Sequence, residues 1–173
     1  ECEITVVQGV EAIEFASPVF TDAYTGLSHS LSYTVMPENA TDKTVRWLSS
    51  DESIATVNES GLITYHSAGE VIITVQSIES EVYAQCTVTV KQAPEEVYLS
   101  MGSAEMTVGQ SVELEVTVGP DNSFDKTVYW KADNKNVVHV DSNGKVTALS
   151  KGTAIVTVTT WNGHEASCML EVK

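Results

Sequence analysis

Apolar and polar residues alternate along most of this chain in short runs. Leu114, Val116 and Val118 alternate with more polar neighbours, and the run 154–158 has a similar pattern. In the first half, the run 31–35 repeats this arrangement. A period of two residues is typical of β-strands with one buried and one solvated face, and no run has the 3.6-residue periodicity of an amphipathic helix. The pattern predicts an all-β protein.

The strand-like runs are separated by Gly, Pro, Asn, Asp and Ser. Ser60-Gly61, Asn143-Gly144 and Asn162-Gly163 each supply a residue that tolerates a positive φ between two apolar runs, as tight hairpins require. About seven short strands in about 80 residues are typical of two packed antiparallel sheets, the immunoglobulin-type β-sandwich. We therefore expect sandwich domains of about seven strands each.

The chain contains an internal repeat. A shift of 83 residues superimposes DKTVRW at 42–47 on DKTVYW at 125–130, and the match continues through the glycines and apolar positions that follow. We interpret residues 10–92 and 93–173 as two tandem immunoglobulin-like domains. Because an overlooked repeat leads to a wrong prediction of the whole fold, we give the repeat more weight than the local sequence patterns.

Residues 1–9 precede the first complete copy. The segment 2–11 is similar to 86–95, which comprises the last strand of the first copy and the linker after it. Residues 1–9 can therefore be read as the last strand of a preceding repeat in a longer array. The alternative is an ordinary N-terminal extension.

The motifs of this sequence resemble those of a known family. The run 37–64 looks like the bacterial immunoglobulin-like domain, group 2, and the second copy carries a weaker version with Pro120, Trp130, Asn143-Gly144 and Gly152. The resemblance implies a β-sandwich that is repeated in surface-exposed or secreted bacterial proteins. Such domains occur in adhesins and in the stalks and accessory modules of polysaccharide-handling enzymes.

Two tryptophans and two cysteines are candidates for the cores. Trp47 and Trp130 lie on the apolar face of equivalent strands and are expected to fill the two sandwiches. Cys86 and Cys168 occupy the same position in different copies, so they are too far apart for a disulfide, which needs Cα atoms within about 7 Å. Both share the inward parity of their strands and are expected to be small buried hydrophobes. Cys2 belongs to the uncertain N-terminal segment.

The charge of the chain excludes several partners. It has 24 acidic and 9 basic side chains and a net charge of −15. Binding to phosphate backbones or anionic lipid depends on clustered Lys and Arg, so we expect no nucleic-acid partner. No apolar run approaches the roughly 20 residues of a membrane helix, so we expect no direct membrane insertion. We expect a monomer.

Candidate catalytic and metal sites are scarce. The four histidines lie in different predicted strands or turns without metal-ligand spacing, and no nucleophile elbow occurs. We therefore expect no enzymatic activity and no cofactor. Calcium is the one ionic alternative, with Glu95 and Glu96 as weak candidates that could meet loop acids of the first copy. The other interpretation of these residues is a solvated acidic surface.

Trp161 fits a purely structural role less well. It lies on the same, solvent-exposed face of its strand as Thr157 and Thr159, directly before a turn that also contains His164. An exposed indole is a stacking platform for a sugar ring or a partner protein, so Trp161 and His164 are candidate ligand contacts. Alternatively, Trp161 covers a neighbouring strand or packs on the adjacent domain.

The family resemblance implies an extracellular or bacterial cell-surface location. Our leading expectation is a non-catalytic structural or interaction module that serves adhesion or spaces a functional end. Its partners would be a protein or glycan at the cell surface and neighbouring immunoglobulin-like repeats in a longer chain. The alternative is an accessory carbohydrate-binding region of a polysaccharide-degrading enzyme or uptake system.

Overall fold

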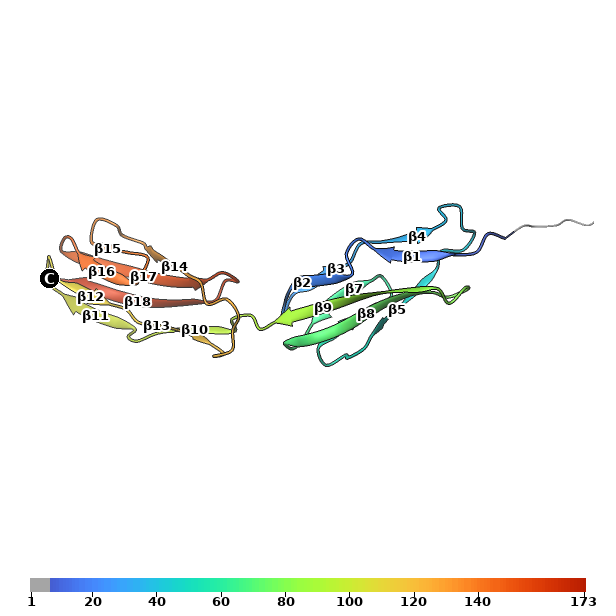
Figure 1. Cartoon of the computed structure of the whole chain (residues 1–173). Coiled ribbons are helices and arrows are strands. Elements are labelled where there is room, and N and C mark those ends of the chain that lie inside the picture. Colours follow the sequence, from blue (N-terminus) through green and yellow to red (C-terminus); the bar gives the residue numbers. More distant parts are fainter. Residues whose placement is uncertain (1–6) are drawn as a thin grey trace, which may run out of the picture. The chain divides into compact units, whose positions relative to one another are not determined.

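The structure, a computed structural model, describes residues 7–173, and every regular element in that range is a β-strand. The chain divides into two compact units between Gln92 and Ala93 (Figure 1). We call the unit that ends at Gln92 unit 1 and the unit that begins at Ala93 unit 2. None of the described residues forms a helix long and apolar enough to cross a membrane. Most of the proposed preceding strand, residues 1–6, lies outside the described residues.

Unit 1 contains nine described strands, which are β1 (Ala12–Phe15), β2 (Val19–Tyr24), β3 (Ser28–Ser30), β4 (Tyr33–Met36), β5 (Val45–Ser49), β6 (Ala55–Val57), β7 (Leu62–Tyr65), β8 (Gly69–Ser77) and β9 (Tyr83–Lys91). One sheet has the order β2-β9-β8-β5. The other layer consists of β3-β7-β6 and the ribbon β1-β4. Neighbours are antiparallel except β2 and β9, which are parallel.

Unit 2 repeats this plan with β10 (Glu96–Leu99), β11 (Ser103–Met106), β12 (Ser111–Glu113), β13 (Val116–Gly119), β14 (Val128–Ala132), β15 (Val138–Val140), β16 (Lys145–Ala148), β17 (Gly152–Thr160) and β18 (Glu165–Val172). Its sheets have the orders β11-β18-β17-β14, β12-β16-β15 and β10-β13. β5 and β14 begin 83 residues apart, at Val45 and Val128, as do β6 and β15, at Ala55 and Val138. The prediction of an all-β chain with two tandem immunoglobulin-like sandwiches is confirmed.

Each unit has nine described strands where about seven are expected, because the first two strands of each sandwich are each interrupted and counted as two. In unit 1 the chain leaves β1, which pairs with β4, and joins the opposite layer as β2, which pairs with β9. Pro18 stands at this crossing, and proline cannot donate a ladder hydrogen bond. β3 and β4 are likewise separated by Leu31 and Ser32. The break between β3 and β4 leaves the apolar alternation of residues 31–35 intact, so the sequence pattern does not reveal it.

The predicted alternation produces the cores. In β8, Val71, Ile73 and Val75 are buried while Glu70 and Ile72 are exposed. The equivalent strand β17 buries its alternate residues in the same way. Each fully buried Val or Ile contributes roughly 1.5–3 kcal/mol relative to an exposed one, so these central strands are the main source of stability for each unit.

The predicted turn glycines position the tryptophans. Gly61 and Gly144 have φ values of +80° and +85°, which L-residues with a side chain rarely adopt. A Cβ at Gly61 would lie 2.6 Å from Cζ2 of Trp47, and one at Gly144 would lie 2.7 Å from Cζ2 of Trp130. Each indole therefore packs directly on the backbone of a hairpin turn.

Candidate ligand-binding surfaces

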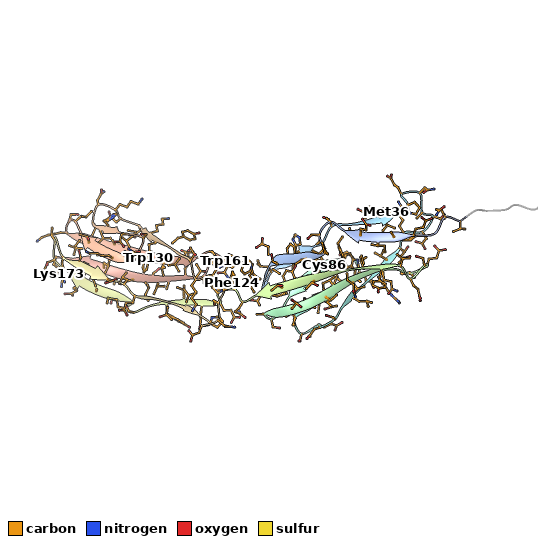
Figure 2. The ribbon with its side chains drawn as sticks, viewed as in Figure 1. Met36, Cys86, Phe124, Trp130, Trp161 and Lys173 are labelled. Carbon is orange, nitrogen blue, oxygen red and sulfur yellow. The ribbon has the colours of Figure 1, made fainter. Side chains whose placement is uncertain are left out.

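Trp47 and Trp130 lie at the margins of the cores and are half-buried. Trp47 is flanked by aromatic rings, with the Phe15 centroid at 6.0 Å and the Tyr33 ring edge-on at 5.2 Å. Trp130 packs against the unit 2 core and also lines a surface pocket (Figure 2). The two residues therefore combine a packing position with access to the surface.

Cys86, on β9 (Figure 2), and Cys168, on β18, are fully buried in their respective cores as free thiols. Burial raises the pKa of both thiols, because the low-dielectric core disfavours the thiolate. A neutral, inaccessible thiol is a poor nucleophile and a poor metal ligand. Cys2 lies outside the described residues.

Trp161 (Figure 2) and His164 both belong to the turn between β17 and β18 in unit 2. The Trp161 indole Nε1 donates a hydrogen bond to the carbonyl oxygen of Asp125 at 3.2 Å, so the ring is half-buried against the loop that precedes β14. The His164 backbone closes the turn by bonding Thr160. The indole nitrogen is thereby engaged within unit 2, and the part of the ring that is still exposed is what a ligand would contact.

The structure places the two calcium candidates at the start of unit 2. Glu95 donates its N–H to the Gly119 carbonyl, and Glu96 begins β10. The Glu96 carboxylate accepts a hydrogen bond of 2.5 Å from the Tyr98 hydroxyl, on the same face of the strand. Within residues 7–173, no group of three His, Cys, Asp or Glu side chains is placed to hold a metal ion.

Two histidines of unit 1 have structural contacts. The His29 ring stacks on Phe20 with a centroid distance of 4.6 Å. His66 Nε2 lies 2.8 Å from the Thr56 hydroxyl. Both contacts join neighbouring strands or turns of unit 1, so these rings contribute to packing and to the local hydrogen-bond network.

Unit 2 has a pocket that the sequence analysis did not single out. It lies between β14 and β15 and has a volume of about 180 Å³. We call it the β14–β15 pocket; it is lined by Trp130, Lys131, Ala132, Lys135, Val138, His139 and Val140. The lining contains two lysines and a histidine but no acid. A residue-by-residue comparison of the two repeats could have revealed it, because the three positively chargeable positions differ between the copies.

The larger openings of unit 1 have mixed charges. A groove of about 680 Å³ beside β4 contains both Glu38 and Lys43. An opening of about 470 Å³ beside β5 contains both Arg46 and Glu59, and it also exposes part of Trp47. These linings are close to neutral and indicate no ligand charge.

Parts of known bacterial proteins are similar to this chain. An uncharacterised protein of Clostridium acetobutylicum is 35% identical over 146 residues, which are 83% of this chain and 15% of that protein. The kappa-carrageenase of Pseudoalteromonas carrageenovora is 46% identical over 66 residues, which are 38% of this chain and 17% of that enzyme. The chain thus spans less than a fifth of the length of either relative.

A solved structure and a family profile agree with the observed fold. The C-terminal fragment of intimin, in complex with the intimin-binding domain of the translocated intimin receptor, matches with a TM-score of 0.51 at 14% identity. The match covers 94% of this chain and 64% of that one. The profile of the bacterial Ig-like domain (group 2) matches residues 20–92 and again residues 93–169. The chain belongs to the bacterial Ig-like domain family, group 2.

Proposed function

We propose that this chain is a non-catalytic module of an extracellular or cell-surface bacterial protein, where it acts as a monomer that spaces or presents a functional end for adhesion. The observation that supports this most is that the features common to both repeats are structural. The paired Trp47–Gly61 and Trp130–Gly144 contacts maintain the sandwich.

The relatives support a modular role. Similar segments make up a small part of longer bacterial proteins, one of which is an enzyme. A domain that recurs beside different neighbours contributes length and stability to the larger chain. Neighbouring immunoglobulin-like repeats are its expected partners within such a chain.

Replacement within the parent protein tests the spacing role. We expect that deletion of this chain impairs surface adhesion, because the functional end is no longer held at its working distance. An unrelated pair of β-sandwich domains of equal length should restore adhesion. Failure of the replacement to restore it, with the substituted protein displayed at a normal level, would contradict spacing and indicate specific binding.

A second candidate is an accessory carbohydrate-binding region. It is favoured by the β14–β15 pocket and by the segment similar to this chain in kappa-carrageenase. Trp161 and His164 are further candidate contacts for a sugar or protein ligand. A glycan array probed with the purified chain tests this function. The variant Trp161→Ala distinguishes the two candidate sites, because it should abolish binding at the turn and leave binding at the β14–β15 pocket unchanged.

A further inference from the structure

We propose that the β14–β15 pocket of unit 2 binds an anionic sugar residue whose ring carries a carboxylate or a sulfate. This deepens the carbohydrate-binding candidate and is independent of the spacing role. The lining combines positively chargeable side chains, an aromatic ring and strand edges, and each of these matches a different part of such a ligand.

The charge of the lining is opposite to that of the chain. Lys131, Lys135 and His139 are all exposed at the pocket, whereas the whole chain has 24 acidic and 9 basic side chains. Among residues 7–173 the observed ion pair joins Lys173 to Glu105, so neither pocket lysine is neutralised by an acid. Their ammonium groups are available to a carboxylate or sulfate.

The nearest acids are engaged in the local structure. Asp133 Oδ1 accepts the Ile155 N–H at 2.7 Å. Asp141 Oδ1 accepts the N–H groups of Asn143 and Lys145 at 2.8 and 3.0 Å, and these hydrogen bonds hold the pKa of Asp141 below its usual value. Asp141 also interacts electrostatically with His139. Neither carboxylate is part of the pocket lining.

The remaining lining suits a sugar ring. Trp130 and Val140, which are both partly exposed, provide an apolar surface for the C–H face of a pyranose. β14 and β15 are each the last strand of their sheet, so within the described residues one edge of each lacks a strand partner. Backbone N–H and C=O groups along those edges can bond sugar hydroxyls. At about 30 Å³ per water, the pocket has room for about six water molecules, which suits a single small ligand group.

Unit 1 provides an internal comparison. At the offset of 83 residues, the three positively chargeable positions are occupied by Leu48, Glu52 and Thr56. The aromatic and apolar framework persists as Trp47 and Val57. Because unit 1 forms the same strands without these charges, the fold does not require them. Their clustering in unit 2 is therefore explained by binding rather than by stability.

Titration of the intact, 15N-labelled chain by NMR tests the proposal. The probes are mannotriose, the β-1,4-linked mannuronate trisaccharide and sulfated mannotriose. We expect both anionic probes to shift the backbone amides of β14, β15 and Lys135, while mannotriose does not. Equal binding of neutral mannotriose, or no shifts at these strands, would overturn the proposal. So would inorganic sulfate or a poly-glutamate peptide binding as tightly as the sugars, since the site would then recognise an anion or an acidic peptide.

A matched variant replaces the three positively chargeable residues of the pocket with the residues at the equivalent positions of unit 1. The triple variant Lys131→Leu, Lys135→Glu and His139→Thr places side chains that the same fold accepts in unit 1. Each lost charge should weaken binding by up to about fivefold, and the triple variant by roughly threefold to a hundredfold. Lys126→Ala, outside the lining, should bind as the unmodified chain does. Unchanged affinity of the triple variant would refute the site, whereas the spacing role would be unaffected by that result.

Discussion

Tyr65 carries a buried hydroxyl in the core of unit 1. The residue is 1% exposed, and within residues 7–173 its hydroxyl has no hydrogen-bond partner. Burial, with a smaller contribution from Cys86, raises the pKa of the phenol from 10.0 to about 12. An unsatisfied buried polar group costs about 1–3 kcal/mol. Because Ala148 occupies the equivalent position in unit 2, the sandwich does not require this hydroxyl.

We expect Tyr65→Phe to stabilise unit 1 by about 1 kcal/mol, because it keeps the ring and removes the unpaired hydroxyl. Urea denaturation measures the change in the free energy of unfolding. Tyr65→Ala is the control for packing and should cost about 3–5 kcal/mol. A clear loss of stability in Tyr65→Phe would mean that the hydroxyl has a partner.

The pH dependence of the Tyr65 variants provides a second readout. Because the folded pKa is raised, the native state favours the protonated phenol. The stability that comes from this raised pKa is fully present below pH 10.0, where the phenol of the unfolded chain is also protonated. It is lost as the pH rises from 10.0 toward about 12. Unit 1 of Tyr65→Phe should therefore lose less stability than the unmodified unit over this range.

The buried thiols are also testable at the scale of single residues. In a Cys2→Ser variant, we expect Cys86 and Cys168 to react with a thiol reagent only after unfolding, because both are inaccessible and have a raised pKa. Titration under native and denaturing, non-reducing conditions measures this. Two thiols in denaturant are expected, whereas none would indicate a disulfide and two fast-reacting native thiols would contradict their burial.

At the scale of elements, two turn glycines form a matched pair. Gly144 and Gly163 have similar φ values of +85° and +96°. A Cβ at Gly144 would lie 2.6 Å from the Leu114 carbonyl oxygen and close to Trp130, while nothing lies within 4 Å of one at Gly163. The two positions share the backbone strain and differ in steric contact.

We expect Gly163→Ala to destabilise unit 2 by about 1–2 kcal/mol through left-handed strain alone. Gly144→Ala should cost a further 1–3 kcal/mol, roughly, because the methyl group displaces the backbone or the indole. Chemical denaturation of both variants measures the difference. Equal effects would show that the turn yields and that Trp130 does not depend on it.

The sequence pattern predicts the elements better than the surface. Alternation identifies the inward faces because burial acts on every second residue, as in β8 and β17. It does not reveal the crossing at Pro18 or the bond from Trp161 to Asp125, which depend on segments that meet only in the folded unit. Alternation does not reveal the β14–β15 pocket either, since its side chains come from two sheets, although a comparison of the two repeats indicates its three positively chargeable positions.

At the scale of the whole molecule, the net charge of −15 predicts a response to salt. Screening weakens the repulsion among acidic side chains, so added NaCl should raise the melting temperature. CaCl2 at equal ionic strength should raise it by the same amount, because within residues 7–173 no group of three His, Cys, Asp or Glu side chains is placed to hold a metal ion. A larger calcium effect that Glu96→Gln abolishes would instead support a calcium site there.

The two units should unfold separately, because each has its own buried clusters. Trp47→Ala and Trp130→Ala each remove an indole that packs on a core and a turn glycine. Both indoles are only partly buried, so each substitution should cost about 2–4 kcal/mol, toward the lower part of the range for buried aromatics. Near-UV circular dichroism during thermal unfolding should show that Trp47→Ala lowers one transition and Trp130→Ala the other. The double variant should show the sum of the two losses within about 0.5 kcal/mol. A single transition that shifts as a whole in both variants would instead mean that the units fold as one cooperative body.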